Sequence, residues 1–156
     1  MNLSKTLAGL LLGLMLLGGA AASSAVAETA GPEQKNIDQA AAEYLGIARA
    51  VELYFEGGRT GDSQYMKKVF LPEANIYGTR AGKLTGGPIQ LLYDMVEGKP
   101  SPTEIIYDIA AVEVAGNIAM VRLEIADWAG RTYTDMFAMI KDCEDWKIAS
   151  KVSLTH

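Results

Sequence analysis

One acidic side chain stands in an otherwise apolar and aromatic stretch near the end of the chain. Asp135 lies between Tyr133 and Phe137 when every second residue is counted. Alternate side chains of a β-strand share one face, so these three would lie together. A carboxylate in an apolar pocket suits proton transfer or the binding of a polar ligand group. Asp135 is therefore the candidate catalytic acid or base. The alternative is a buried structural acid that binds a tyrosine hydroxyl or Arg122.

The preceding segment, residues 118–128, indicates whether the face that carries Asp135 points toward the core or toward solvent. Its odd-numbered positions from 119 to 125 are apolar, whereas Arg122 and Glu124 occupy even positions. The odd positions should therefore face the core. A hairpin that pairs Asp127 with Arg131 places Leu123 opposite Asp135, and both then face the interior.

A second carboxylate, Asp108, has two alternative placements. A two-residue turn at 115–116 directs Asp108 inward with the other even-numbered positions 106, 110 and 112. A three-residue turn directs positions 105, 107, 109 and 113 inward instead, because a slip of one residue exchanges the faces of a strand. In the first placement Asp108 and Asp135 lie two strands, or about 10 Å, apart. Two such carboxylates could divide the acid and base roles.

Composition excludes several other kinds of site. The 156 residues include one His and one Cys, too few for a His/Cys zinc cluster or a disulfide within the chain. The formal net charge of -5 is unlike the basic stripe of nucleic-acid-binding proteins. No glycine-rich phosphate loop is present. We therefore expect no metal, no cofactor and no nucleic-acid partner. Strand alternation would place His156 inward, but it is the last residue, and chain ends usually fray.

The first residues have the features of an export signal. Lys5 precedes a leucine-rich apolar run, and the sequence Ala25-Val26-Ala27 matches a small-x-small cleavage site. We expect a signal peptide at residues 1–27, a flexible leader at 28–35 and one domain at 36–156. The mature protein would then be periplasmic or extracellular, with no membrane attachment after cleavage.

Three helices are predicted ahead of most of the strands. Apolar residues recur in steps of three and four from Ile37 to Phe55, with Asn36 as N-cap and a stop at residues 57–58. Asp62 should cap a short second helix that includes Phe70 and ends before Pro72. Two short strands, 75–78 and 83–85, surround a turn at 81–82. Residues 87–88 should open a third helix that closes at residue 98.

Four long strands are predicted for the remainder, at residues 103–114, 118–128, 132–140 and 146–154. Turns separate them at 115–117, 129–130 and 142–145. Long consecutive strands twist and curl, so the fold class is α+β with helices on one face of a curved, mainly antiparallel sheet. In the last strand alternation directs these side chains inward: Trp146, Ile148, Ser150, Val152 and Leu154.

Several short motifs occur in a characteristic order across nearly all of the predicted domain. They are YFEGG (54–58), GD (61–62) with Met66, FLPEA (70–74), GGPI (86–89), YTDMF (133–137), and WKI (146–148) with Lys151. This set resembles the NTF2-like superfamily, and within it the putative lumazine-binding branch, which is related to SnoaL-like domains. The resemblance implies a cone with a pocket between the helices and the concave sheet. It does not imply that lumazine is the ligand, nor does it choose an activity.

Three hypotheses for function remain open. The first is an exported domain that binds a small apolar or aromatic molecule in the cone. The second is a cofactor-free isomerase or dehydratase that uses Asp135, and the third is a structural module with a filled cone. A second polar group that converges on Asp135 would favour the enzyme. The candidate ligand-binding residues are Tyr54, Met66, Tyr77, Asp108, Leu123, Tyr133, Asp135, Phe137 and Ser150.

The outer face of the predicted sheet is unusually apolar. Met120 and Met136 lie on it beside Arg122 and Glu124, together with Ala126, Ala138 and Ile140. Solvated faces seldom carry so much apolar surface in one patch. We therefore expect a homodimer through this face.

Overall fold

The structure is a computed structural model that describes residues 31–156. The predicted signal peptide and its cleavage site lie outside the described residues. In chain order the elements are α1 (Pro32–Thr60), α2 (Ser63–Lys67), β1 (Phe70–Arg80), β2 (Lys83–Pro88), α3 (Gln90–Val96), β3 (Ile106–Ala115), β4 (Ile118–Asp127), β5 (Tyr133–Asp142) and β6 (Asp145–Thr155).

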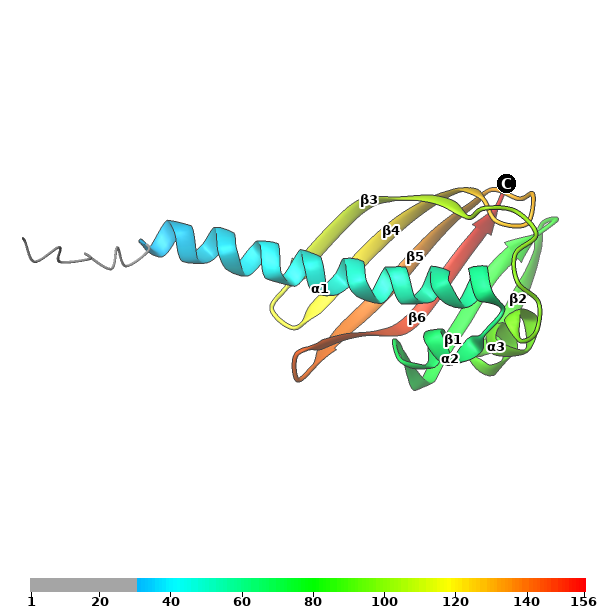
Figure 1. Ribbon diagram of the computed structural model, residues 1–156, viewed down its shortest axis with the longest axis horizontal. Helices are drawn as coiled ribbons and strands as arrows, with labels where there is room; N and C mark the ends of the chain where they lie inside the picture. Colours follow the sequence, from blue (N-terminus) through cyan, green and yellow to red (C-terminus); the bar gives the residue numbers. More distant parts are fainter. Residues whose placement is uncertain (1–30) are drawn as a thin grey trace, which may run out of the picture. The chain divides into compact units, whose positions relative to one another are not determined.

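All six strands form one curved sheet with the order β2-β1-β6-β5-β4-β3. Neighbouring strands are antiparallel except β1 and β6, which run parallel. Figure 1 shows α1 lying along one face of this sheet, with α2 and α3 grouped near β1 and β2. The predicted α+β class is confirmed.

The long helix α1 differs from the prediction at both ends. It begins at Pro32, four residues before the predicted N-cap Asn36, and it ends at Thr60. Gly61, at φ 70°, closes it by donating its N–H to the carbonyl oxygen of Gly57 at 2.9 Å. A left-handed glycine is a common helix terminator. The predicted stop at residues 57–58 is wrong.

The two glycines inside α1 provide room for packing. A Cβ atom on Gly57 would lie 2.7 Å from Cγ of Met66. One on Gly58 would lie 2.3 Å from Cζ2 of Trp128. Both distances are shorter than any normal carbon–carbon contact. These glycines therefore allow close approach of neighbouring side chains and do not terminate the helix.

Only the second half of α1 contributes to the core. Ile47, Val51 and Phe55 are fully buried, whereas Ile37 is 56% exposed and Tyr44 is 47% exposed. The first half of the helix extends beyond the sheet (Figure 1). The predicted apolar face is thus correct for its C-terminal positions and wrong for those before Gly46.

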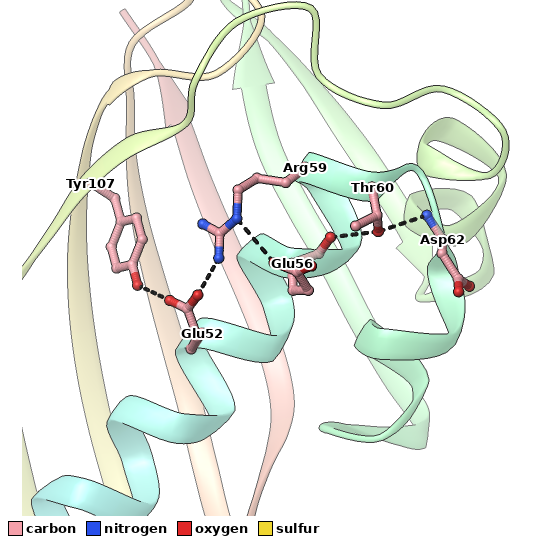
Figure 2. A network of polar contacts seen from close by, with 6 residues as sticks. All are labelled: Glu52, Glu56, Arg59, Thr60, Asp62 and Tyr107. Carbon is pink, nitrogen blue, oxygen red and sulfur yellow. Dashed lines mark hydrogen bonds and ion pairs between the residues drawn. The ribbon is translucent and has the colours of Figure 1, made fainter.

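Polar contacts attach α1 to the β5–β6 hairpin and to the edge strand β3. Glu43 accepts hydrogen bonds from Lys141 Nζ at 2.9 Å and from Trp146 Nε1 at 3.0 Å. Figure 2 shows Glu52 between Arg59 and Tyr107, whose hydroxyl donates to it at 2.5 Å. Burial, reinforced by Glu52, raises the pKa of Tyr107 to about 12.

The short elements occur in the predicted order, but several of their bounds differ from the prediction. The Asp62 side chain accepts a hydrogen bond from the Gln64 N–H at 2.9 Å and so caps α2. Ala81 and Gly82 form the β1–β2 turn with φ values of 50° and 73°. Phe70 and Pro72 belong to β1, so α2 is shorter than predicted and β1 is longer. Helix α3 begins at Gln90, two residues after the predicted opening.

The β4–β5 hairpin has the predicted pairing. Leu123 lies opposite Asp135 and Ile125 lies opposite Tyr133. Both residues of the first pair are buried. The alternation of residues 118–128 therefore identified the inner face correctly.

Bulges change the facing of two other strands. In β3 the extra residue is Ala110, so Val112 pairs with Val121 on the inner face while Asp108 pairs with Glu124 on the outer face. The inward placement of Asp108 is wrong. Each predicted alternative holds for only one part of β3, because the bulge exchanges the faces.

In β6 the extra residue is Ala149, which has no partner on β5. Trp146 and Ile148, before the bulge, are buried as predicted. After it Val152 and Leu154 are 52% and 47% exposed, so their predicted inward placement is wrong. The inner positions after the bulge are Lys151, Ser153 and Thr155.

Candidate functional site

A cavity of about 770 Å³ opens to solvent between the inner face of the sheet and the end of α1. Strands β1, β2, β4, β5 and β6 line it, together with α3 and the segment 99–102. Its apolar walls include Ile76, Leu92, Val96, Ile125 and Trp128. A pocket of this size, mostly apolar with a few convergent polar groups, is typical of small-molecule sites.

Four polar side chains form the floor of this cavity. Asp135 Oδ2 accepts a hydrogen bond from the Tyr54 hydroxyl at 3.0 Å. Asp135 Oδ1 accepts from Lys151 Nζ at 2.9 Å and also from the Ser153 hydroxyl. Lys151 Nζ also donates to Ser153 Oγ at 2.7 Å. Asp135 is 1% exposed and Lys151 is 8% exposed, so the ion pair is almost completely withdrawn from bulk water.

The sheet and the helix position these groups together. Asp135 on β5 lies directly opposite Ser153 on β6, and Lys151 is one inner position away. The bulge at Ala149 is what turns Lys151 and Ser153 toward the cavity. Tyr54 comes from the buried face of α1, where its ring contacts Phe137 edge-on with a centroid distance of 5.2 Å. Lys151 Nζ lies 6.0 Å from the centroid of the same tyrosine ring.

The environment keeps the Tyr54 hydroxyl protonated. Burial, and after it the negative charge of Asp135, raises the pKa of Tyr54 well above its ordinary value of 10.0. Tyr54 is therefore a permanent hydrogen-bond donor to the carboxylate at physiological pH. In the part of the chain that the structure describes, no buried side-chain oxygen or nitrogen lacks a partner.

The structure separates the nine predicted site residues into three groups, of which two lie at or beneath the cavity. Tyr54, Tyr133 and Asp135 line the cavity. Leu123, Phe137 and Met66 are fully buried core residues that support the floor.

The remaining candidates lie away from the floor. Tyr77 borders the cavity, but it pairs with Val152 and is 44% exposed. Asp108 and Ser150 lie on the outer face, where Ser150 donates to Asn75 Oδ1 at 2.8 Å. His156 contacts Thr134 Oγ1 through Nε2 at 3.0 Å, so its predicted inward placement is wrong.

Sequence reasoning missed two residues of the floor. Lys151 belongs to the set of motifs that resembles the family, without a predicted role in the site, and Ser153 belongs to none of those motifs. A signal existed, because Lys151, Ser153 and Thr155 form a polar series at alternate positions. Strand alternation from Trp146 assigned that series to solvent, since nothing in the sequence marks Ala149 as a bulge.

The family is decided by a match that covers most of the domain. The model of the family described as “Putative lumazine-binding” matches residues 42–153. The chain belongs to this NTF2-like family.

Relatives of this NTF2-like protein include a named aldolase and several NTF2-like proteins of known structure. The aldolase FrzH of a Cladobotryum species is 30% identical over 111 residues, which are 70% of this chain and 89% of FrzH. An NTF2-like protein of unknown function from Shewanella baltica is 34% identical, with a TM-score of 0.68, over 82% of this chain and 98% of its own. One from Silicibacter pomeroyi is 26% identical, with a TM-score of 0.70, over 75% and 98%.

The structure also bears on which groups this NTF2-like domain could hold. Within residues 31–156, no cluster of three or more His, Cys, Asp or Glu side chains could bind a metal ion. Among the same residues, no helix combines the length and the apolar character that a bilayer crossing requires.

Proposed function

We propose that this protein binds a small apolar or aromatic carbonyl compound in the cavity and catalyses proton transfer at or next to the carbonyl, in an aldol-type reaction. The observation that carries the proposal is the convergence of Tyr54, Lys151 and Ser153 on the buried carboxylate of Asp135. That convergence favours an enzyme over a domain that only binds. The relative FrzH is named as an aldolase, which supports the reaction class.

The hydrogen-bond inventory of the floor leaves capacity for a substrate. A carboxylate offers about four lone-pair positions, and three donors occupy three of them on Asp135. The Lys151 ammonium carries three N–H groups, of which Asp135 and Ser153 accept two. One acceptor position and one charged donor therefore remain beside the cavity. This pair suits a substrate that loses a proton while its carbonyl oxygen gains negative charge.

A retro-aldol cleavage illustrates the proposed roles. Asp135 removes the proton of a β-hydroxyl group, the carbon–carbon bond breaks, and an aldehyde leaves. The electron pair passes to an enolate, whose oxygen accepts a hydrogen bond from Lys151. The enolate carbon then takes the proton back from Asp135, so the carboxylate is regenerated. Tyr54 holds the carboxylate in place throughout.

The test uses methodol, a methoxynaphthyl β-hydroxyketone that releases a fluorescent aldehyde on retro-aldol cleavage. We expect turnover above the buffer rate, and a loss of at least about 100-fold in Asp135→Asn, the scale of general acid–base catalysis. Lys151→Met should also lower the rate, because Lys151 donates to the enolate oxygen. Lys141→Met, which removes a lysine that does not line the cavity, is its matched control. Methodol binding without turnover would indicate a domain that only binds, and equal rates for wild type and Asp135→Asn would contradict the assigned role.

Nitrobenzisoxazole provides a second, independent measurement. Its ring opens on removal of a single carbon-bound proton, so it reports a base in an apolar cavity without requiring aldol chemistry. Turnover of this compound alone would support proton transfer and reject the aldol class. No turnover of either compound would leave ligand binding as the function to be measured.

Two features outside the cavity complete the proposal. We propose that residues 1–27 direct export and that the protein works in the periplasm or the medium. An intact mass that begins at Glu28 in secreted or envelope material supports this, whereas a full-length mass contradicts it. We also propose a homodimer through the outer sheet face, where Met120, Met136, Val152 and Leu154 are exposed.

A further inference from the structure

The charges that line the cavity are strongly unbalanced. Arg80, Lys99, Arg131 and Lys151 line it, whereas Asp135 is the single acidic side chain among the described residues that line it. Lys151 is neutralised by Asp135 in the floor. Three cationic side chains therefore border the cavity of a chain whose formal net charge is -5.

These three cations have no carboxylate partner in the described part of the chain. Neither Arg80 nor Arg131 takes part in an ion pair there, and Lys99 Nζ donates to the main-chain carbonyl of Asp94 at 3.0 Å. Elsewhere in the described residues both situations occur: Arg59 binds Glu52 and Glu56, whereas Arg49 forms no ion pair. An anionic group at the cavity would therefore not have to displace a carboxylate that is already bound to these cations.

The backbone holds two of these cations at the rim. The segment that carries Lys99 is attached to the end of α1, because Gly98 N–H donates to Gly61 O at 2.8 Å and Ser101 N–H donates to Gly58 O at 2.9 Å. Arg131 follows a tight turn in which the Trp128 N–H donates to its carbonyl oxygen at 2.9 Å.

We propose that the compound bound in this cavity is an organic anion. Its apolar or aromatic body would lie against Leu92 and Trp128, and its acidic group would lie at the rim among Arg80, Lys99 and Arg131. This inference rests on the proposed function, because it assigns a substrate class to the same cavity. Guanidinium groups bind carboxylate and phosphate oxygens in pairs, which suits either acidic group.

Two dyes with one aromatic skeleton test the proposal. Anilinonaphthalene sulfonate carries an anionic group, and phenylnaphthylamine is the same skeleton without it. Fluorescence titration of the full-length or mature protein should show tighter binding of the sulfonate. Arg80→Gln and Arg131→Gln should each weaken sulfonate binding about 3- to 5-fold and leave phenylnaphthylamine within about twofold, the upper part of the scale of an exposed ion pair.

Arg122→Gln is the matched control. It removes the same charge from the outer sheet face, where the Arg122 side chain is 49% exposed and pairs with Glu124. Sulfonate binding that falls equally in Arg122→Gln would place the dye on the outer face or show a general charge effect, and would overturn the proposal. Naphthoate and naphthyl phosphate as competitors of the sulfonate then distinguish a carboxylate from a phosphate preference.

The outcomes separate this inference from the proposed function. Equal affinity for both dyes, unaffected by the arginine substitutions, would reject an anionic ligand while leaving an apolar binding cavity intact. No binding of either dye would contradict both the ligand class and the cavity as a binding site. Methodol turnover with no preference for the sulfonate would keep the reaction and discard the anion.

Discussion

The Tyr54 hydroxyl and the Asp135 carboxylate meet at 3.0 Å although 81 residues separate them in the chain. One comes from the helix that covers the sheet and the other from the inner face of β5. Their contact forms only when α1 packs on the sheet, so the floor of the cavity and the hydrophobic core assemble together. The folded state and the chemistry of the site therefore depend on the same side chains.

The buried pair of Asp135 and Lys151 should dominate the response to mutation. Removing one partner leaves a buried charge without its counterion, which costs about 3–5 kcal/mol of unfolding free energy. We expect Asp135→Asn and Lys151→Met each to lower stability in urea or thermal unfolding. The double variant should lose less than the sum of the two, by at least about 1 kcal/mol, because the residues are in direct contact.

If the losses of the two single variants simply added in the double variant, the pairing of Asp135 with Lys151 would be contradicted. Lys147→Met serves as the control, since Lys147 is a neighbour in β6 whose ammonium contacts the main-chain oxygen of Lys68. It should change stability only slightly. Catalytic and structural roles remain distinguishable, because a purely structural Asp135 would leave the methodol rate per folded molecule unchanged.

Alkaline pH should expose the two perturbed tyrosines. The pKa values of Tyr54 and Tyr107 are raised in the folded state, mainly by burial. The folded protein therefore holds these protons more tightly than the unfolded chain, whose tyrosines ionise near pH 10. Their contribution to stability is complete below about pH 10 and is lost as pH rises, through about 12 for Tyr107. Urea unfolding between pH 8 and pH 12 should show this fall.

Single phenylalanine variants assign the effect. Tyr107→Phe should flatten the decrease in unfolding free energy between about pH 10 and 12. In a separate measurement of tyrosinate absorbance at alkaline pH, Tyr54→Phe should remove the slowest phase, because buried Tyr54 ionises only when the protein unfolds. Tyr65→Phe is the control at a partly exposed tyrosine. A pH profile unchanged by both Tyr54→Phe and Tyr107→Phe would show that other groups control alkaline unfolding.

Gly58 should tolerate no side chain without rearrangement. An added Cβ would lie 2.3 Å from the Trp128 indole, which lines the cavity. We expect Gly58→Ala to cost about 1–3 kcal/mol through overpacking, despite the higher helix propensity of alanine. Trp128→Leu in the same chain should recover part of that loss. A stabilised Gly58→Ala in thermal unfolding would show that the contact with Trp128 is easily relieved.

The outer face should determine the oligomeric state. Met136 pairs with Val152 across β5 and β6 on this face, and the two are 37% and 52% exposed. Met136→Glu would place a charge within the proposed dimer contact, so we expect light scattering to show a dimer for wild type and a monomer for the variant. Lys83→Glu, at the far β1–β2 turn, is the control. A wild-type monomer at micromolar concentration would reject this interface.

Local patterns predicted much of the framework. The alternation of residues 118–128 was sufficient to place Leu123 opposite Asp135, because one side of that hairpin is plainly apolar. The cap at Asp62 and the turn at 81–82 follow from residue chemistry that acts within a few positions. The inward position of Asp135, the centre of the site, was therefore accessible from sequence.

The remaining features depend on contacts between distant segments. Gly57 and Gly58 look like a helix end in the sequence. In the structure their small size makes room for Met66 and Trp128, which come later in the chain. The bulges at Ala110 and Ala149 carry no local signature, and each reverses the facing of the residues beside it. Lys151 and Ser153 were consequently assigned to solvent. Arg80, Lys99 and Arg131, the cations at the rim of the cavity, come from three separate segments, so no single motif reveals them.

The extra residue at Ala149 also affects how relatives of this protein should be compared. If the same residues paired regularly, without the bulge, the side chains at 152 and 154 would turn inward, and the floor of the cavity would carry valine and leucine in place of lysine and serine. A relative that is one residue shorter here would direct the aligned lysine and serine inward from a regular strand, with no bulge at all. Whether a relative can hold the Asp135 ion pair therefore depends on how this strand pairs with its neighbour as well as on which motif residues it carries.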